Sequence, residues 1–360
     1  MKAYPVPLTF LSLLFSVIAV SQKPKSGFSP VDSFAATVKY RGNLVSLTKD
    51  LTDPYSDQLF KARAIFKWIT ENIRYDYKYY NKHGYEGEET KTFKCKDDAD
   101  CEAKIENYET KYIDRVVRKK KAVCQGYSML FKRMCDIAGL KSEIIPGYTR
   151  TEYYQVGTRG TLDHVWNSIL IDSNYYLLDV TWAAGGCTKD DDGKLLKFIK
   201  HFNEYYWLTP SGDFVRNHYP KNPKWTLIPG YTEEQFAANP YYEPWQLEYL
   251  KLKMPNAGVI NTKMGDTIHF KIEYRVGFRD LQINSNIFRN PDIWIPQKIG
   301  RRKTIPRLDT IAVKQQRYVP YRRDGRFYEF DYVVTDKELY YLDILCDRDR
   351  IMRFNVKVTE

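Results

Sequence analysis

The chain reads Ala-Val-Cys-Gln-Gly-Tyr at residues 122–127, Asp-His-Val-Trp-Asn at residues 163–167 and Leu-Asp-Val-Thr-Trp at residues 178–182. These stretches place a cysteine, a histidine and an aspartate in that order, as Cys124, His164 and Asp179. A thiol becomes a good nucleophile when a base takes its proton, and the base needs a third group to hold its tautomer and orientation. The order of the three residue types therefore predicts a cysteine enzyme that transfers acyl groups.

Cys124 is expected to begin a helix that runs to Ala138, with Gly139 placed to end it in a left-handed conformation. The unpaired N–H groups and the macrodipole at a helix N-terminus favour a thiolate, and the basic residues 118–121 act in the same direction. The backbone N–H of Cys124 can also face a developing oxyanion. The competing interpretation, a cysteine buried as a small apolar side chain, is the better one for Cys135 on the same helix.

The sequence predicts a hairpin that carries His164 and Asp179, built from two β-rich runs, 164–171 and 175–182. Asp179 lies in an apolar run, where a buried carboxylate without a partner is costly, and an imidazole is its natural partner. Any even-length loop puts the two side chains on one face of the hairpin. A two-residue loop at 173–174 would leave them about 13 Å apart along the strand, so we expect a wider loop or a bulge.

The first 250 residues mix helices and strands. Apolar residues at three- and four-residue spacing predict an amphipathic helix over residues 57–73. Residues 81–110 are rich in Lys, Glu, Asp and Gly, which predicts a charged surface insertion that is mobile or partly helical. Within this insertion, Cys95 and Cys101 could pair in an oxidising compartment. A helix followed by a sheet indicates an α+β domain over residues 22–250.

The chain changes character after residue 255. Turn residues separate short β runs, and no helical period survives among them. We therefore expect a second domain over residues 256–360, an all-β, immunoglobulin-like antiparallel sandwich that contributes no catalytic residue. The expected strands include residues 267–274, 281–284, 311–313, 327–334, 339–345 and 351–358.

The first 21 residues have the features of a signal peptide. Lys2 supplies a positive charge, residues 8–20 are almost entirely apolar, and residues 19–21 offer small side chains for cleavage. The apolar run is shorter than the roughly 20 residues of a membrane-spanning helix, although an uncleaved N-terminal anchor stays open. We expect an exported protein, whether periplasmic, cell-surface or extracellular, with no transmembrane segment in the mature chain.

The chain carries a formal net charge of +11. This balance favours acidic partners such as a cell-envelope surface, although a solvated basic face explains the C-terminal clusters at least as well. The sequence shows no nucleic-acid motif, so nucleic acid is not an expected partner. The five histidines are scattered without metal-ligand spacing, and no phosphate-binding glycine motif occurs. We therefore expect neither a metal nor another cofactor.

At these residues the chain resembles the transglutaminase-like superfamily, a papain-like group of cysteine enzymes. The resemblance covers roughly residues 57–185, and its motifs are specific when they are taken together. They are Trp68-Ile69, residues 123–128, Gly139-Leu140, Pro146-Gly147-Tyr148, residues 163–167 and residues 178–182. Residues 213–243, with His218-Tyr219-Pro220, look like the extension of the kyphoscoliosis-peptidase branch. With the N-terminal leader, the resemblance implies a secreted protein of bacterial type.

The resemblance implies that Cys124 is the nucleophile, His164 the general base and acid, and Asp179 the orienting group. Protein or peptide substrates would be cleaved or transferred at peptide or glutamine-type amides through a thioester, with hydrolysis favoured over cross-linking. Residues of the same motifs are expected to contact the substrate, namely Trp166, Trp182 and Tyr127. Two other functions stay open: a non-catalytic binding module for envelope or protein partners, and a sugar–protein amidase.

Overall fold

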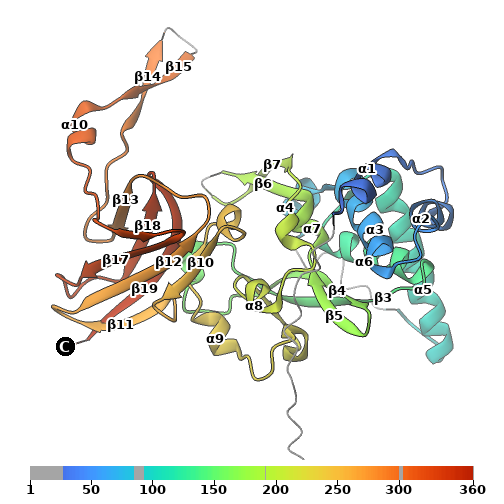
Figure 1. Cartoon of the computed structure of the whole chain (residues 1–360). Coiled ribbons are helices and arrows are strands. Elements are labelled where there is room, and N and C mark those ends of the chain that lie inside the picture. Colours follow the sequence, from blue (N-terminus) through green and yellow to red (C-terminus); the bar gives the residue numbers. More distant parts are fainter. Residues whose placement is uncertain (1–26, 85–92, 191, 300–302, 360) are drawn as a thin grey trace, which may run out of the picture.

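The structure is a computed structural model of the chain, and it describes residues 27–84, 93–190, 192–299 and 303–359. The longer helices gather at one end of the molecule and two β-sheets at the other, with a third sheet between them (Figure 1). The expected signal peptide lies outside the described residues. Among those residues, none of the helices combines the length and the apolar character that crossing a bilayer requires.

The helices differ widely in length. Their bounds are α1 Ser29–Thr37, α2 Leu44–Thr52, α3 Gln58–Asn72, α4 Tyr77–His83, α5 Asp98–Lys119, α6 Cys124–Ile137, α7 Val180–Ala184, α8 Ser211–Phe214, α9 Glu233–Ala237 and α10 Thr310–Lys314. α3 confirms the helix expected over residues 57–73. Asp57 caps its N-terminus by accepting hydrogen bonds from the N–H groups of Leu59 and Phe60. Its apolar face packs against α1, α2 and α6 in the core.

The expected insertion over residues 81–110 is partly helical, which was one of its two stated alternatives. Its second part belongs to α5, a continuous helix of 22 residues. This helix stays exposed in its charged first half and becomes core only in its last turns, which bury Tyr112, Ile113, Val116 and Val117. Because the first half is charged and exposed, the helical spacing of apolar residues in α5 is visible in the sequence only over its last turns.

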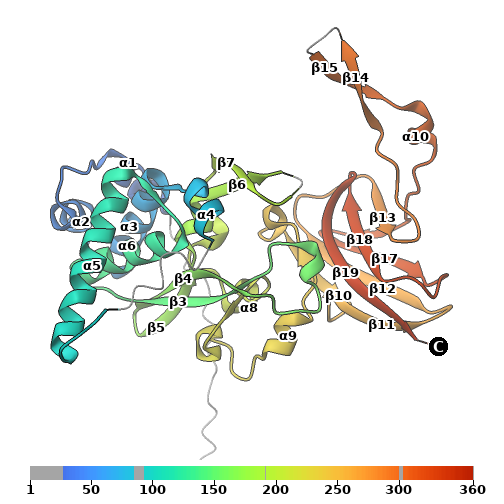
Figure 2. The same ribbon diagram turned by 180° about the vertical axis from the view of Figure 1, so that it is seen from behind.

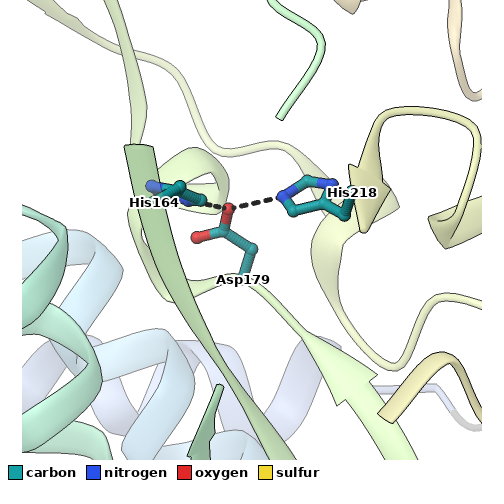
Figure 3. Close-up of side chains that lie close together, drawn as sticks. All are labelled: His164, Asp179 and His218. Atoms are coloured by element: carbon teal, nitrogen blue, oxygen red, sulfur yellow. Dashed lines mark hydrogen bonds and ion pairs between the residues drawn. The ribbon is translucent and has the colours of Figure 1, made fainter. Parts of the chain in front are cut away.

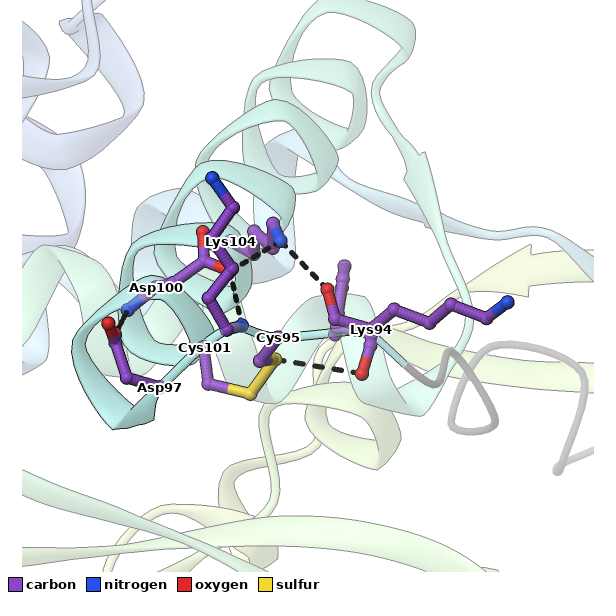
Figure 4. The surroundings of a disulfide bond; sticks show 8 residues. Lys94, Cys95, Asp97, Asp100, Cys101 and Lys104 are labelled. Atoms are coloured by element: carbon purple, nitrogen blue, oxygen red, sulfur yellow. Dashed lines mark hydrogen bonds and ion pairs between the residues drawn. A yellow bond between two sulfur atoms is a disulfide. The ribbon is translucent and has the colours of Figure 1, made fainter.

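A disulfide joins the start of α5 to the segment before it (Figure 4). It links Cys95 and Cys101, the pair that the sequence suggested. Two polar contacts fix the same turn: the Asp97 side chain accepts a hydrogen bond from the Asp100 N–H at 2.8 Å, and Lys104 Nζ lies 2.6 Å from Asp100 Oδ2. The disulfide and these bonds hold the N-terminal turn of α5 in place.

A four-stranded antiparallel sheet lies at the centre of the first region, which consists of the described residues before residue 250. Its strands are β3 Lys141–Thr149, β4 Leu162–Ile171, β5 Asn174–Leu178 and β8 His218–Pro220, in the order β5-β4-β3-β8. α6 packs against β3 and β4. Trp166 of β4 lies directly on Gly147 of β3, where an added Cβ would come within 2.1 Å of the indole. Only glycine permits this approach.

The β4–β5 hairpin differs from the expected one in its loop and in its second strand. The loop is Asp172-Ser173, and both residues have positive φ angles, 47° and 65°, as in tight hairpin turns. The second strand ends at Leu178, because Asp179 is already the N-cap of α7. The expectation of a strand through residue 182 was wrong, and so was the expectation of a wider loop or a bulge.

Two further sheets form the β-rich region. Their strands are β9 Tyr241–Tyr242, β10 Leu250–Met254, β11 Val259–Lys263, β12 Thr267–Tyr274, β13 Leu281–Ser285, β16 Arg322–Asp324, β17 Phe327–Val333, β18 Tyr341–Cys346 and β19 Asp349–Thr359. One sheet has the order β10-β12-β17-β16 and the other β11-β19-β18-β13, with β9 paired to β19. The Phe270 and Phe354 rings meet at 5.2 Å between the sheets. β11 and β19 are parallel, unlike the antiparallel arrangement expected, and an immunoglobulin-like topology stays a prediction.

The remaining strands form short pairs: β1 Arg74–Tyr75 with β2 Lys121–Ala122, β6 Gly185–Lys189 with β7 Leu195–Lys200, and β14 Trp294–Ile299 with β15 Lys303–Leu308. β14 and β15 form a ribbon that projects away from the β-rich region beside α10 (Figure 2). The strand expected over residues 311–313 was wrong. Asp309 caps a helix there by accepting hydrogen bonds from the N–H groups of Ile311 and Ala312.

The β-rich region is bonded directly to the first region. β9 pairs with β19, and Arg350 Nε lies 2.9 Å from a Glu243 carboxylate oxygen beside that pairing. Asn355 Nδ2 donates to the carbonyl of Val156 at 2.6 Å. The apolar core also continues from one region into the other. The β-rich region therefore packs directly against the chain around Val156 and Glu243.

Candidate active site

Cys124 is the first residue of α6, with Val123 as the N-cap. First-turn N–H groups have no acceptor within their own helix, so the positive end of the helix dipole lies at this residue. The Cys124 side chain is almost covered, at 2% exposure. Tyr80, Leu162 and Val165 pack around it. Cys124 therefore has almost no contact with solvent in this structure.

Two of the cations that precede Cys124 in the sequence are engaged elsewhere. Lys121 Nζ lies 3.9 Å from an Asp76 carboxylate oxygen, and Arg118 donates to the backbone carbonyl of Asp114. We therefore base the chemistry of Cys124 on the helix terminus and on the histidine beside it, rather than on the basic run.

His164 and Asp179 are in direct contact inside the protein (Figure 3). His164 Nε2 lies 2.7 Å from Asp179 Oδ2, and both residues are buried. In the ladder Asn167 faces Leu178, which sets Asp179 diagonally across from His164 on the same face. Diagonal cross-strand neighbours are about 7–8 Å apart, within reach of long side chains. The hairpin loop lies one residue earlier than the 173–174 loop considered from the sequence. This shift brings Asp179 within reach of His164.

The Asp179 carboxylate accepts four hydrogen bonds. Oδ1 accepts from the backbone N–H groups of Thr181 and Trp182, at 2.8 and 3.0 Å, as the N-cap of α7. Oδ2 accepts from His164 and also from His218, whose Nε2 lies 3.2 Å away (Figure 3). Burial would raise the pKa of this carboxyl, but the His164 charge and the hydrogen bonds from the two histidines hold it well below its usual range. Asp179 is therefore ionised.

The His164 ring lies between Asp179 and Cys124. Because Nε2 bonds the carboxylate, Nδ1 is the ring nitrogen left for the thiol. Burial alone would lower the pKa of His164, but the Asp179 charge and hydrogen bond, with a further hydrogen bond to Cys124, raise it well above its usual range. The site therefore favours an imidazolium at His164, which is the partner that a thiolate requires.

His218 is a site residue that the sequence analysis did not predict. It begins β8, is fully buried and reaches Asp179 from the opposite side to His164. The sequence placed it only in an extension of the family, because it lies 39 positions beyond Asp179, with α7, β6, β7 and α8 in between. Burial is the main cause that lowers the pKa of His218 below its usual range. The one sequence signal was a histidine that opens a short β-type run.

The three expected substrate-contact residues lie in different environments. Trp182 borders the cleft beside the site and stacks on His164, with ring centroids 5.0 Å apart and planes at 27°. Trp166 is 1% exposed beneath the sheet, and Tyr127 is 0% exposed with its hydroxyl donating to the Ile73 carbonyl. The expectation was therefore wrong for Trp166 and Tyr127, which are core residues.

An open cleft of about 330 Å³ borders His164 and Trp182. Six aromatic residues line it, and polar residues such as Asp163 and Lys189 line it as well. The aromatic lining residues are Tyr75, Tyr80, Trp182, Phe198, Tyr206 and Trp245. Trp245 comes from the 3-10 turn Pro244–Gln246, at the junction with the β-rich region. The cleft therefore suits an extended chain with apolar side groups.

Replacing Tyr80 with alanine is expected to speed the alkylation of Cys124 several-fold, because Tyr80 packs on the thiol and borders the cleft. Peptide mass mapping after brief iodoacetamide treatment measures the rate. Tyr79→Ala is the matched control, since the Tyr79 ring lies 4.5 Å from that of His83 on the same helix. Equal rates in the two variants would show that Tyr80 does not limit access.

His164, Asp179 and His218 also offer three atoms that a metal ion could use, all within 4.8 Å of one another. Here hydrogen bonds occupy those atoms, and the remaining carboxylate oxygen caps α7. The His164 Nε2–Asp179 Oδ2 distance of 2.7 Å is that of a charge-assisted hydrogen bond. The cluster is therefore complete as a hydrogen-bonded unit.

Three residues of the site lie within a segment that matches a known family model. Residues 43–184, which include Cys124, His164 and Asp179, match the model of the transglutaminase-like domain. These residues form a transglutaminase-like domain. Human kyphoscoliosis peptidase is similar, with 31% identity over 219 residues that cover 60% of this chain and 29% of that protein. Hillarin of Drosophila melanogaster is 24% identical over 213 residues, covering 56% of this chain and 23% of that protein.

The chain spans less than a third of the length of these curated relatives. The similarity to them extends beyond the family segment, since the aligned stretch is 219 residues long for the human protein. A crystal structure of a TGase aligns over 51% of this chain and 38% of that chain, with 16% identity and a TM-score of 0.27. A TM-score this low does not indicate a shared overall fold.

Proposed function

We propose that this protein is a cysteine acyl-transfer enzyme that hydrolyses peptide or glutamine-type amides. Cys124 attacks the amide carbonyl, and His164 first takes the thiol proton and then gives a proton to the leaving amine. Asp179 holds the imidazole and stabilises its charged form. Water then attacks the thioester, with His164 as the base, and releases the acid.

The buried contact between His164 and Asp179 carries this proposal. An ionised carboxylate at 0% exposure, with an imidazole at 2.7 Å, is an expensive arrangement that packing alone does not require. The Cys124 side chain hydrogen-bonds the same imidazole and influences its pKa. The three side chains thus form one connected chain from thiol to carboxylate, in the order that nucleophilic catalysis uses.

The start of α6 supplies the oxyanion site. A negative charge develops on the carbonyl oxygen when the thiolate attacks. The backbone N–H of Cys124 is at the first helical position, so it has no acceptor within the helix. This N–H and the helix dipole stabilise the oxygen next to the reacting sulfur.

Hydrolysis is favoured over cross-linking by the relative named as a peptidase, although the chain spans only 29% of it. Export is supported by the Cys95–Cys101 disulfide, because disulfides persist mainly in oxidising compartments, and by the apolar N-terminal leader in the sequence. Acidic partners are supported by the exposed basic side chains of Arg322, Arg323 and Arg326, of which Arg322 is strongly exposed.

Incubating the purified chain with short glutamine-containing peptides and a labelled primary amine tests the proposal. Mass spectrometry separates the products, since hydrolysis gives cleavage or deamidation and cross-linking incorporates the amine. We expect hydrolytic products from the wild type and none from Cys124→Ala. Predominant amine incorporation would support transamidation instead. Binding of peptides with no covalent product from the wild type would support the non-catalytic binding module.

A further inference from the structure

His218 is held as firmly as the residues of the expected triad, although the reaction outlined above does not use it. Its ring stacks on Phe214, with centroids 4.2 Å apart, and packs between Trp182 at 4.5 Å and Trp166 at 5.0 Å. It is 0% exposed and does not border the cleft. These three rings hold the imidazole in a single orientation behind Asp179.

Both ring nitrogens of His218 face oxygen atoms. Nε2 lies 3.2 Å from Asp179 Oδ2, and Nδ1 lies 2.8 Å from Asn217 Oδ1. The Asn217 Nδ2 group in turn lies 3.3 Å from the Tyr206 hydroxyl. In this orientation of the amide, both nitrogens would have to carry a proton, and His218 would be a cation.

A half-turn of the Asn217 amide gives every group of this chain a hydrogen-bond partner while His218 stays neutral. Asn217 Nδ2 then donates to His218 Nδ1, and Asn217 Oδ1 accepts from the Tyr206 hydroxyl. The two ends of an amide are nearly identical in shape, so the half-turn changes no packing. The resulting chain runs from Tyr206 through Asn217 and His218 to Asp179, with each donor facing one acceptor.

The charges around Asp179 favour this second arrangement. His164 is closer to Asp179 Oδ2 than His218 is, 2.7 against 3.2 Å, and charge-assisted hydrogen bonds are the shorter ones. If both histidines were cations, two positive charges would face one carboxylate oxygen in the interior, and each would disfavour the other. Asp179 and His164 are the ionisable groups that influence the pKa of His218, and burial with the His164 charge lowers it to about 4.

We propose that His218 is a positioning residue, a neutral imidazole with its proton on Nε2, which fixes the Asp179 carboxylate for His164. Asn217 and Tyr206 hold this tautomer. The backbone N–H groups of α7 fix Oδ1, and His218 fixes Oδ2, so the carboxylate cannot rotate away from His164. A neutral donor also leaves the full negative charge of Asp179 for the His164 imidazolium, whereas a cation at His218 would cancel it.

Nitrogen-15 NMR of the full chain with labelled histidines tests the tautomer directly. Long-range correlations show which ring nitrogen carries a proton, and the variants His218→Gln and His164→Gln assign the signals. We expect His218 to be neutral at neutral pH, protonated on Nε2, and to stay so well below the usual histidine pKa of about 6.5. A cationic His218 at neutral pH, or a proton on Nδ1, would overturn the proposal.

Kinetics test the positioning role, and this part rests on the proposed function. His218→Phe keeps the ring packing but removes the donor, while a glutamine can offer its amide N–H near the position of Nε2. We expect His218→Phe to lower kcat about 10- to 100-fold, with KM unchanged. This cost is typical when a residue that hydrogen-bonds and orients a functional side chain is lost. His218→Gln should recover most of kcat. The matched control is His269→Gln, a change at an exposed histidine of β12 that bonds Asp331.

The rate of Cys124 alkylation by iodoacetamide at neutral pH gives a readout that needs no substrate. It should fall in His218→Phe and recover in His218→Gln, with thermal unfolding recorded for each variant. Equal alkylation rates in all variants would overturn the positioning role even if turnover is never detected. Equal losses of kcat in the phenylalanine and glutamine variants would show a packing role instead. Absence of turnover in the wild type would overturn only the proposed function.

Discussion

Replacing Cys124 with alanine is expected to abolish amide turnover while the protein stays folded. The Cys124 thiol hydrogen-bonds the His164 imidazole, so its loss removes the reaction path rather than a part of the stabilisation. In comparable triads, removal of the nucleophile lowers kcat by on the order of 10⁵- to 10⁶-fold. The change is small and buried, since the side chain is 2% exposed, so the fold should tolerate it.

Turnover of a peptide amide, with thermal unfolding measured in parallel, checks this result. Cys135→Ala is the matched control, because Cys135 is a fully buried thiol on the same helix and burial raises its pKa well above the usual range. The control should keep most of the activity. Undiminished turnover in Cys124→Ala, or a comparable loss in the control, would exclude Cys124 as the nucleophile.

Replacing Asp179 with asparagine is expected to lower kcat by about 10⁴-fold, the cost seen when a triad histidine takes the wrong tautomer. Asparagine keeps an oxygen for the N–H groups of Thr181 and Trp182, so the cap of α7 survives. Its NH₂ group would face His164 Nε2, which must then lose its proton to accept a hydrogen bond. The imidazole therefore turns from a donor toward Asp179 into an acceptor.

The same variant should change how stability depends on pH. The folded-state pKa of Asp179 is depressed, so its contribution is present above the usual carboxyl range and is lost as pH falls below about 4. The folded-state pKa of His164 is raised, so its contribution is present below about pH 6.5 and is lost as pH rises from there. Denaturant unfolding should show both slopes flattened in Asp179→Asn. Unchanged slopes would contradict the buried ion pair.

Local patterns predicted the helix of Cys124 and the strand of His164 well. Cys124 begins α6, and Gly139, with φ of 71°, follows its end, because an apolar period and a glycine stop are local features. The cost of burying a carboxylate predicted that Asp179 would contact His164. It did not predict the hairpin geometry that brings the two side chains together. The position of a hairpin loop depends on backbone angles at Asp172 and Ser173, which neighbouring strands select.

The failures concern contacts made between distant segments. His218 reaches Asp179 only because β8 pairs with β3 at the end of the sheet, and no spacing in the sequence encodes that pairing. Trp166 and Tyr127 stood in the expected motifs, yet the sheet and α6 turn them into the core. A motif shows that residues belong together, whereas tertiary packing decides which of them border the cleft.

The central claim is that Cys124, His164 and Asp179 act as one unit, and the pH dependence of Cys124 alkylation tests it most directly. Peptide mass mapping after iodoacetamide treatment gives the rate for Cys124 alone, and His269→Ala serves as the control. We expect the wild type and the control to react at a nearly constant rate across neutral pH. His164→Ala should react appreciably only as pH approaches about 8.5, where ordinary thiols ionise. Superimposable profiles for the wild type and His164→Ala would contradict the account.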